Sequence, residues 1–191
     1  PGYCANPRNP ASAGPALRAM LVALEDWVVR GAPPPASLVP RRADETGIPA
    51  NAIRRPAVPG ITWAPGDNPP TDAAQPFPTI VSALDTDGNE VAGLRLPHLA
   101  VPLGTYTGTN VYRDMPAELC DRDGTYIPFA RTRADRERTG DPRASLEERY
   151  GTRAAYVARV RAAADALVAG RLLLAEDADR YVAAAERVEG F

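Results

Sequence analysis

Residues 15–30, with the sequence PALRAMLVALEDWVVR, carry the clearest helix pattern in the chain, and one face of that helix has to be buried. Pro15 suits the first helical turn, where its missing N–H costs nothing, and Gly31 suits the C-terminal cap. Large apolar side chains recur at spacings of three and four, at Leu17, Met20, Leu21, Leu24 and Val28, with Trp27 beside them. Burying each such side chain contributes roughly 1.5–3 kcal/mol, so this face is expected to find a partner.

The residues that follow offer little regular structure to receive that face. Residues 32–78 are rich in Pro, Gly, Asp and Asn, and so long an irregular stretch is typically functional or laid over another surface. Residues 79–84 and 89–95 predict a β-hairpin around a turn at Asp85-Thr-Asp-Gly88, and residues 99–107 predict a third extended segment.

The last third of the chain predicts helices that are rich in alanine and modest in apolar area. Charges crowd residues 131–149, which we interpret as a solvated face, and Ser145 and Glu148 have the spacing of a capping box. Thr152 is suited to cap the next helix, and a final helix is expected over 176–188. The apolar stripe of the first of these two helices consists of Tyr156, Val160, Ala163 and Leu167.

The composition excludes several classes of partner. The chain has 22 basic and 24 acidic residues, whereas nucleic-acid binders concentrate positive charge on one face. No apolar run approaches the roughly 20 residues that span a bilayer, and no signal peptide is visible. A single His and two distant Cys lack the clustered spacing of a zinc site, and residues 85–90, DTDGNE, depart from calcium-loop spacing. We therefore expect no nucleic acid, membrane, metal or cofactor.

His98, the only histidine, is the natural candidate for an acid–base residue. A general base needs a nucleophile or a substrate proton within hydrogen-bond reach, and a partner that orients its ring. The serines of the chain all lie outside the Gly-x-Ser-x-Gly turn that exposes a nucleophile; they are Ser12, Ser37, Ser82 and Ser145. We interpret His98 as a structural or solvent-facing residue and expect no catalytic residue in this chain. The alternative, a self-contained enzyme in which His98 is an acid–base group, is left open for test.

Two aromatic-rich segments, GTYTGTNVY and GTYIPFA, combine Tyr and Phe with Gly and Pro, as loops that line pockets commonly do. The candidate substrate-pocket residues in them are Tyr106, Thr109, Asn110, Tyr126 and Phe129. Alternatively, their aromatic side chains form the core of the irregular region.

Cys4 and Cys120 are the only two cysteines, and the sequence leaves open whether they form a disulfide or remain free, buried thiols. A bond would close a long loop and contribute roughly 4–5 kcal/mol on the chain-entropy model. Pairing would favour an exported protein; otherwise the compartment is open.

Several segments together resemble the C-terminal part of the alpha/beta-hydrolase-domain family of large bacterial proteins. They are CANPRNP, ALRAMLVALEDWVVRGAPPPAS, GLRLPHLAVPLGTYTGTN, LCDRDGTYIPFARTRADR, GDPRASLEERYG and RLLLAEDADRYVAAAE. The resemblance covers essentially all of the chain, with one departure: members often carry an aromatic residue after TYTG, where this chain has Thr109.

The resemblance implies a serine hydrolase with its catalytic groups at strand ends of a central sheet. In such members the serine lies well upstream, and the histidine lies in a Gly-x-x-His segment just before the position of Cys4. None of those motif positions exists here, so no catalytic residue can be carried over.

The fold class expected is therefore α/β, with an α/β-hydrolase parent fold and a chain of mixed α and β with much irregular structure. Three parts are expected: residues 1–31 as the C-terminal helix region of the hydrolase body, 32–130 as an appended region with a hairpin, and 131–191 as terminal helices. We expect the chain to be a segment or subunit of an esterase-like hydrolase that shapes the substrate entrance, with the upstream catalytic part, in the same or a separate chain, as its partner.

The rival hypothesis is an independent, non-catalytic binding or structural module. The two differ in the state of the apolar stripe on residues 15–30. A self-sufficient module must bury Leu17, Leu21 and Leu24 within itself, whereas a segment of a larger hydrolase leaves them exposed for a partner.

Overall fold

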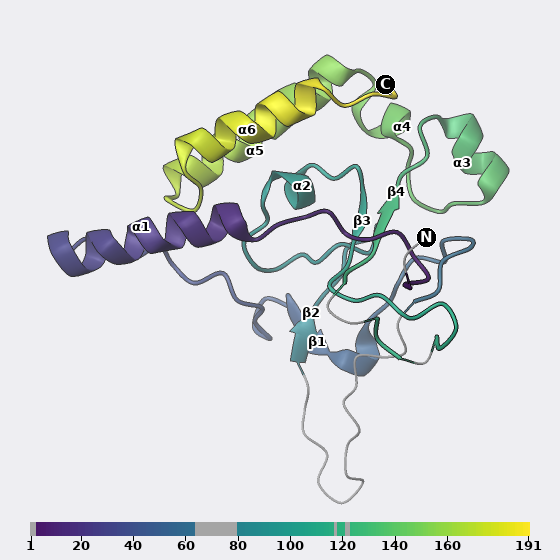
Figure 1. The fold of residues 1–191 in the computed structure, drawn as a ribbon, viewed down its shortest axis with the longest axis horizontal. Helices are drawn as coiled ribbons and strands as arrows, with labels where there is room; N and C mark the ends of the chain where they lie inside the picture. Colours follow the sequence, from purple (N-terminus) through teal and green to yellow (C-terminus); the bar gives the residue numbers. More distant parts are fainter. Residues whose placement is uncertain (1–2, 64–79, 117, 121–122) are drawn as a thin grey trace, which may run out of the picture.

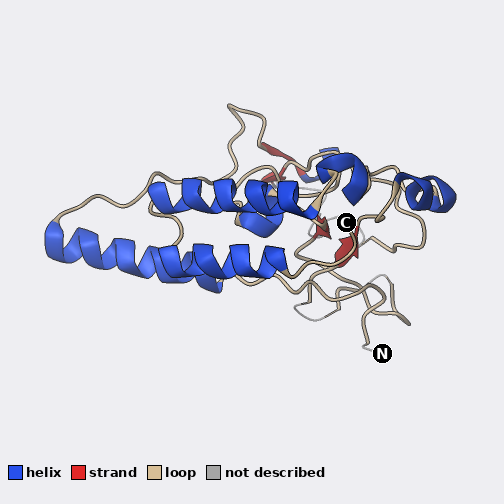
Figure 2. Cartoon of the chain, turned by 90° about the horizontal axis from the view of Figure 1, so that it is seen from above, coloured by secondary structure: helices blue, strands red, loops and turns tan. Residues whose placement is uncertain are grey.

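The computed structural model describes residues 3–63, 80–116, 118–120 and 123–191. In chain order its elements are α1 (Gly14–Arg30), β1 (Gly47–Pro49), the short 3-10 helix η1 (Ala50–Ala52), β2 (Ile80–Ser82), α2 (Pro97–Ala100), β3 (Gly104–Tyr106), β4 (Tyr126–Pro128), α3 (Arg133–Thr139), α4 (Leu146–Tyr150), α5 (Arg153–Ala169) and α6 (Ala175–Glu186). Helices α5 and α6 pack along each other, and α1 lies beside them (Figure 1). Seen from above, the long helices make up the extended side of the molecule, and the strands gather at the other end (Figure 2).

Helix α1 confirms the helix expected over residues 15–30. A proline occupies its first turn, and Gly31 caps its end with φ 69°, a left-handed conformation that suits glycine. Only small side chains of α1 are buried, namely Ala16, Ala19 and Ala23. Arg18 adds a link to α6, because its guanidinium donates two hydrogen bonds, of 3.0 and 2.6 Å, to the carboxylate of Asp177. Helix α1 is therefore held by small alanine side chains, by the Arg18–Asp177 ion pair and by a longer contact, of 3.5 Å, between Asp26 and Arg171.

The strands form two antiparallel pairs, and they correct the expected hairpin. β1 pairs with β2, with Ile48 opposite Val81, and β3 pairs with β4, with Thr105 opposite Ile127. The turn at 85–88 is present, since the Asp85 N–H donates to the Asn89 carbonyl at 2.8 Å. A second strand over 89–95 is not formed: β2 pairs with β1 instead, and the turn is closed by an isolated bridge between Leu84 and Glu90.

The extended segment expected over 99–107 is only half correct. β3 forms its second half, but Pro97 opens the short helix α2, which contains His98 and runs to Ala100. Proline is tolerated at the first position of a helix because no backbone N–H is needed there, so Pro97 favours the helical turn.

The terminal helices begin where local capping chemistry predicts. Ser145 and Glu148 form a reciprocal capping box at α4, and the Thr152 hydroxyl accepts from the Ala155 N–H at the start of α5. The charge run before them is not wholly solvated. Helix α3 has no buried residue, but Arg143 and Asp141 are buried together, with side chains only 1% and 9% exposed. The interpretation of 131–149 as a solvated face is therefore wrong for this pair.

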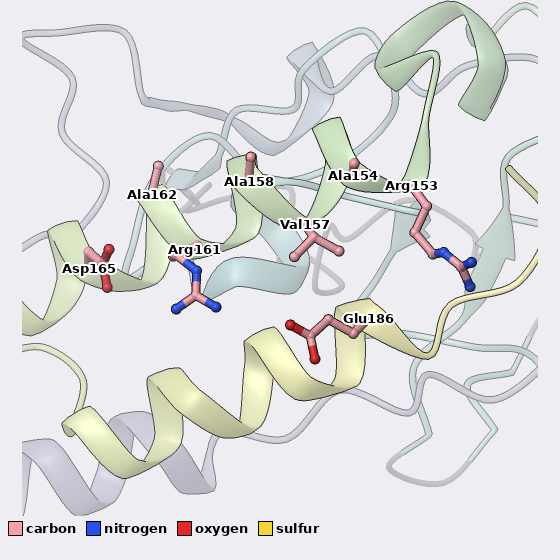
Figure 3. A pocket seen from close by; sticks show the side chains of 8 residues that line it. All are labelled: Arg153, Ala154, Val157, Ala158, Arg161, Ala162, Asp165 and Glu186. Atoms are coloured by element: carbon pink, nitrogen blue, oxygen red, sulfur yellow. The ribbon is translucent and has the colours of Figure 1, made fainter.

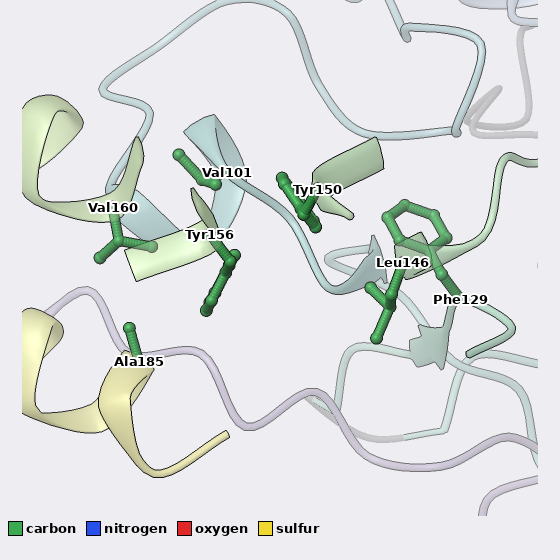
Figure 4. Packing of buried hydrophobic residues seen from close by; sticks show 7 residues of the cluster. All are labelled: Val101, Phe129, Leu146, Tyr150, Tyr156, Val160 and Ala185. Carbon is green, nitrogen blue, oxygen red and sulfur yellow. The ribbon is translucent and has the colours of Figure 1, made fainter. Parts of the chain in front are cut away.

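The hydrophobic core lies where α4, α5 and α6 meet the β3–β4 pair. Tyr150 and Tyr156 meet edge to face with ring centroids 5.1 Å apart, and the Tyr150 hydroxyl donates to the Pro102 carbonyl at 2.7 Å. The buried side chains of this cluster are Val101, Phe129, Leu146, Tyr150, Tyr156, Val160 and Ala185 (Figure 4). A second cluster joins α1 to the other helices through Ala16, Leu96, Ala164, Leu173 and Ala178.

Candidate functional site

Several large apolar side chains of α1 are exposed to solvent. Leu17, Leu21 and Leu24 are 62%, 67% and 50% exposed, and Val28 is 76% exposed. We call these four residues the α1 stripe. The three leucines are therefore not buried by the described residues, and the C-terminal half of α1 reaches beyond α5 and α6 (Figure 1). Contiguous exposed apolar surface of this kind marks an interaction site.

An apolar groove continues the α1 stripe on one side. It has a volume of about 480 Å³ and lies between α1 and the proline-rich segment, with Met20, Trp27, Leu38 and Leu94 among its lining residues. Arg171 fixes the rim, because its guanidinium donates to the Pro33 carbonyl at 3.0 Å and lies 3.5 Å from the Asp26 carboxylate. This groove was not predicted; its signal in the sequence is the apolar pair Leu38 and Val39 within the proline-rich stretch.

Strand β3 is held at both ends by a buried asparagine. The amide of Asn89, which is fully buried, donates to the Gly104 carbonyl at 3.1 Å and accepts from the Tyr106 N–H at 2.8 Å. The Thr105 hydroxyl donates to the Asp87 carbonyl. Nothing in the local sequence around Asn89 indicated this role, because both of its partners lie more than a dozen residues away.

Two cavities adjoin the end of β3, and both are lined by Tyr106, Thr107 and Gly108. The first, the His98 cavity, has a volume of about 280 Å³ and is also lined by Glu90, Leu94, Leu96 and Leu99. The second, the Thr109 cavity, has a volume of about 200 Å³ and is lined by Ile53, Ser82 and Thr109 among others.

The five candidate substrate-pocket residues fall into two groups. Tyr106 and Thr109 line these cavities, and Tyr126 supports Tyr106, with ring centroids 4.8 Å apart. Asn110 is buried and joins loops, since its amide donates to the Asn6 carbonyl at 3.0 Å. Phe129 is buried in the core beneath the guanidinium of Arg149, which lies 4.0 Å from its ring centroid.

His98 is a half-buried residue between two tyrosines. Its Nδ1 lies 3.3 Å from the hydroxyl of Tyr181 on α6, and its ring meets Tyr106 edge to face at 5.4 Å. Burial lowers the pKa of His98 to about 4, so the imidazole is neutral near pH 7. Ser12 lines the same cavity, but its hydroxyl accepts from the Gly14 N–H, and no hydrogen bond joins it to His98 among the described residues. The arrangement orients an imidazole without giving it a nucleophile.

Two of the remaining serines also serve the fold. Ser145 caps α4, and the Ser82 hydroxyl donates to the Ala83 carbonyl at 3.2 Å. Within the described ranges, no cluster of three or more His, Cys, Asp or Glu is placed to share a metal ion. In the same part of the chain, no helix combines the length and apolar character needed to cross a bilayer.

Cys4 and Cys120 form a disulfide, with Cα atoms 5.6 Å apart, which resolves the alternative left open by the sequence. The bond ties the segment before α1 to the loops around the β3–β4 pair. The Asn9 N–H adds a bond to the Gly124 carbonyl, at 2.9 Å.

A further groove runs along the outer side of α5 and has a volume of about 710 Å³ (Figure 3). Its lining includes the small side chains Ala154, Ala158 and Ala162 of α5, and Glu186 of α6 also contributes to it. Its charged lining residues are Arg153, Arg161, Asp165 and Glu186, and it shares no lining residue with the His98 cavity.

The family of the chain follows from a comparison with family models. The model described as alpha/beta hydrolase domain matches residues 1–183. The chain belongs to this family. No curated protein and no solved structure matches it significantly. As a member of the alpha/beta hydrolase domain family, the chain has the expected α/β class, and its helices and small antiparallel sheets make it a mixed α and β structure.

Proposed function

We propose that this chain is the non-catalytic segment or subunit of an esterase-like α/β-hydrolase, in which it covers part of the catalytic body and shapes the entrance for an ester substrate. The observation that carries the proposal is the α1 stripe. Leu17, Leu21 and Val28 are each more than 60% exposed, and burying a side chain of this size completely contributes roughly 1.5–3 kcal/mol. Covering this face with a partner surface would therefore stabilise the complex.

The family membership supports a hydrolase body as that partner. An α/β fold buries the apolar faces of its helices against a central sheet, and the hydrolase chemistry depends on groups at the strand ends of that sheet. The strands of the described residues form only two-stranded antiparallel pairs. The α1 stripe would then lie against the sheet or helices of the catalytic body.

The position of the cavities supports a role at the entrance. Leu94 lines both the apolar groove beside α1 and the His98 cavity, and Ala16 of α1 lines the cavity as well. A catalytic body seated on α1 would therefore adjoin the His98 cavity. Loops that carry pockets beside a rigid scaffold are common places for substrate selection.

One test concerns the chemistry of the chain by itself. A serine-reactive fluorophosphonate probe is expected to label none of its four serines, because none lies in a Gly-x-Ser-x-Gly turn and the hydroxyls of Ser12, Ser82 and Ser145 are engaged in backbone contacts and caps. Mass spectrometry measures the adduct. Stoichiometric labelling of any serine would show that the chain carries its own nucleophile and would overturn the non-catalytic assignment.

The second test concerns the docking face. Reading the coding sequence upstream of Pro1 identifies the part to co-express, where we expect a Gly-x-Ser-x-Gly segment. The double variant Leu17→Glu, Leu21→Glu is then expected to lose co-purification with that part, or, in one continuous chain, to lose ester turnover. The matched control is Val29→Glu, which is 70% exposed but lies on another side of α1. If the double variant behaves like the control, the α1 stripe is not the docking face and the independent-module hypothesis is favoured.

A further inference from the structure

The His98 cavity has the composition of a small-ligand pocket. At about 280 Å³ it is larger than a cavity of about 150 Å³, which suffices for benzene, and it is smaller than most pockets for drug-sized molecules. Leu94, Leu96 and Leu99 give it apolar walls, and Tyr106 adds an aromatic one. This combination fits one substituted ring.

Most polar groups around the cavity are already engaged. The amide of Asn9 donates to the Thr107 carbonyl at 3.0 Å and accepts from the Ala11 N–H at 2.8 Å. The Ser12 hydroxyl accepts from the Gly14 N–H, and the Thr107 hydroxyl donates to the Thr109 carbonyl. These side chains form part of the cavity wall, and their own hydrogen bonds leave few donors or acceptors for a ligand.

His98 is the exception. Its ring is fixed from two sides, through Nδ1 at the Tyr181 hydroxyl and through ring contacts with Tyr106 and Tyr181. Its Nε2 makes no hydrogen bond with a described residue. Among the described residues, the fully buried side-chain atoms that lack a hydrogen-bond partner are Asp26 Oδ1 and Arg95 Nε, so Nε2 of His98 is not completely enclosed. An oriented imidazole nitrogen with a free hydrogen-bonding position therefore adjoins an aromatic wall.

We propose that the His98 cavity binds a neutral, single-ring aromatic compound that bears a hydroxyl or a carbonyl group. The ring packs against Tyr106 and the leucines, and the polar group hydrogen-bonds to Nε2 of His98. An anionic ligand is disfavoured, because the imidazole is uncharged near pH 7 and the described residues that line the cavity include no Arg or Lys.

As a statement about substrate, this assignment rests on the proposed function: the ring would be the acyl or alcohol part of the ester. As a statement about binding, it concerns this chain alone. The two can fail separately, because the experiment below uses only the 191-residue chain and measures no hydrolysis.

The experiment uses the fact that His98 is the only histidine, so histidine-selective isotope labelling gives one imidazole signal. At pH 7 the labelled chain is titrated with phenol, with benzoate as the anionic ring and with cyclohexanol as the non-aromatic alcohol. Phenol is expected to shift the His98 resonances to saturation, and the other two are expected to give no saturable shift over the same concentrations. The absence of a saturable shift with phenol, or equal shifts with all three compounds, would overturn the proposal.

A variant separates the cavity from non-specific binding. Tyr106→Leu removes the aromatic wall and is expected to weaken phenol binding roughly tenfold. Tyr112→Leu, which alters an aromatic side chain near the disulfide and away from the cavity, is the matched control. Unchanged phenol affinity in Tyr106→Leu contradicts the proposal. If this variant does not fold, protection of His98 by phenol against diethyl pyrocarbonate in the unaltered chain decides, and lack of protection refutes the site.

Discussion

The buried pair Asp141–Arg143 offers the sharpest test of how this chain is stabilised. The Arg143 guanidinium donates to both carboxylate oxygens of Asp141, at 2.9 and 2.6 Å. It also donates to the Thr105 hydroxyl at 2.8 Å and to the Ile127 carbonyl at 2.9 Å, which places a charge between β3 and β4. Burial alone would raise the pKa of Asp141, but the hydrogen bonds and positive charge of Arg143 outweigh it and hold that pKa below its ordinary value.

The substitution Asp141→Asn keeps the shape of the side chain and removes its charge. The guanidinium of Arg143 then stays buried without a counter-charge, and losing one member of a buried pair typically costs about 3–5 kcal/mol. This is a large share of the 5–15 kcal/mol by which a domain is typically stable. With a urea dependence of about 1–3 kcal/mol per molar, the unfolding midpoint should fall by about 1 M or more. Far-UV circular dichroism during urea titration measures the change.

The control is Glu137→Gln, which removes the same charge from an ion pair with Arg133 whose side chains are 54% and 69% exposed. Exposed pairs contribute at most about 1 kcal/mol, so this variant should unfold almost like the unaltered chain. If Asp141→Asn costs no more than Glu137→Gln, burial of the pair does not govern its energetic weight, and the reasoning fails.

Three further outcomes are expected. Thiol titration of the denatured, unreduced chain should find no free thiol, and reduction of Cys4–Cys120 should lower the free energy of unfolding by roughly 4–5 kcal/mol; two free thiols would contradict the bond. Ser145→Ala should cost about 1 kcal/mol and raise the pKa of Glu148, which hydrogen bonds from Ser145 and Arg136 lower to about 2; carboxyl NMR reads the titration. The imidazole of His98 should titrate near pH 4 because burial disfavours its charged form. The unfolded chain binds this proton below about pH 6.5, so the free energy of unfolding should be highest above that pH and should fall as the pH is lowered toward 4. A folded-state midpoint near 6.5 would show that the ring is not buried.

The features predicted correctly from the sequence depend on residues that are close together along the chain. Proline and glycine at the two ends of α1, the capping box at Ser145 and the cap at Thr152 each act within about four positions, so their bonds can be inferred from spacing alone. The exposed stripe on α1 was predictable for a related reason, because no later segment offered enough apolar surface to cover it.

The features that were missed depend on pairing between distant residues. β2 was expected to pair along the hairpin, but its partner β1 lies more than thirty positions earlier in a stretch without regular pattern. Arg143 sits in a run of charges that resembles a solvated face, and its burial depends on carbonyls of β4 that local sequence does not reveal. At the candidate site, the aromatic and glycine-rich context of Tyr106 was enough to name it as a candidate pocket residue. The hydrogen bonds by which Asn89 holds β3 had no signal in the local sequence.

The disulfide gives the chain a closed covalent ring that runs from Cys4 through α1, the proline-rich segment and β3 to Cys120, with the terminal helices attached outside it. A single backbone cut within the ring, for example after the exposed Arg41 or Arg42, leaves both pieces joined. A nicked chain would therefore migrate near 20.3 kDa without reductant and separate into two fragments with it. The ring makes the α1 stripe inseparable from the His98 cavity even after proteolysis between them.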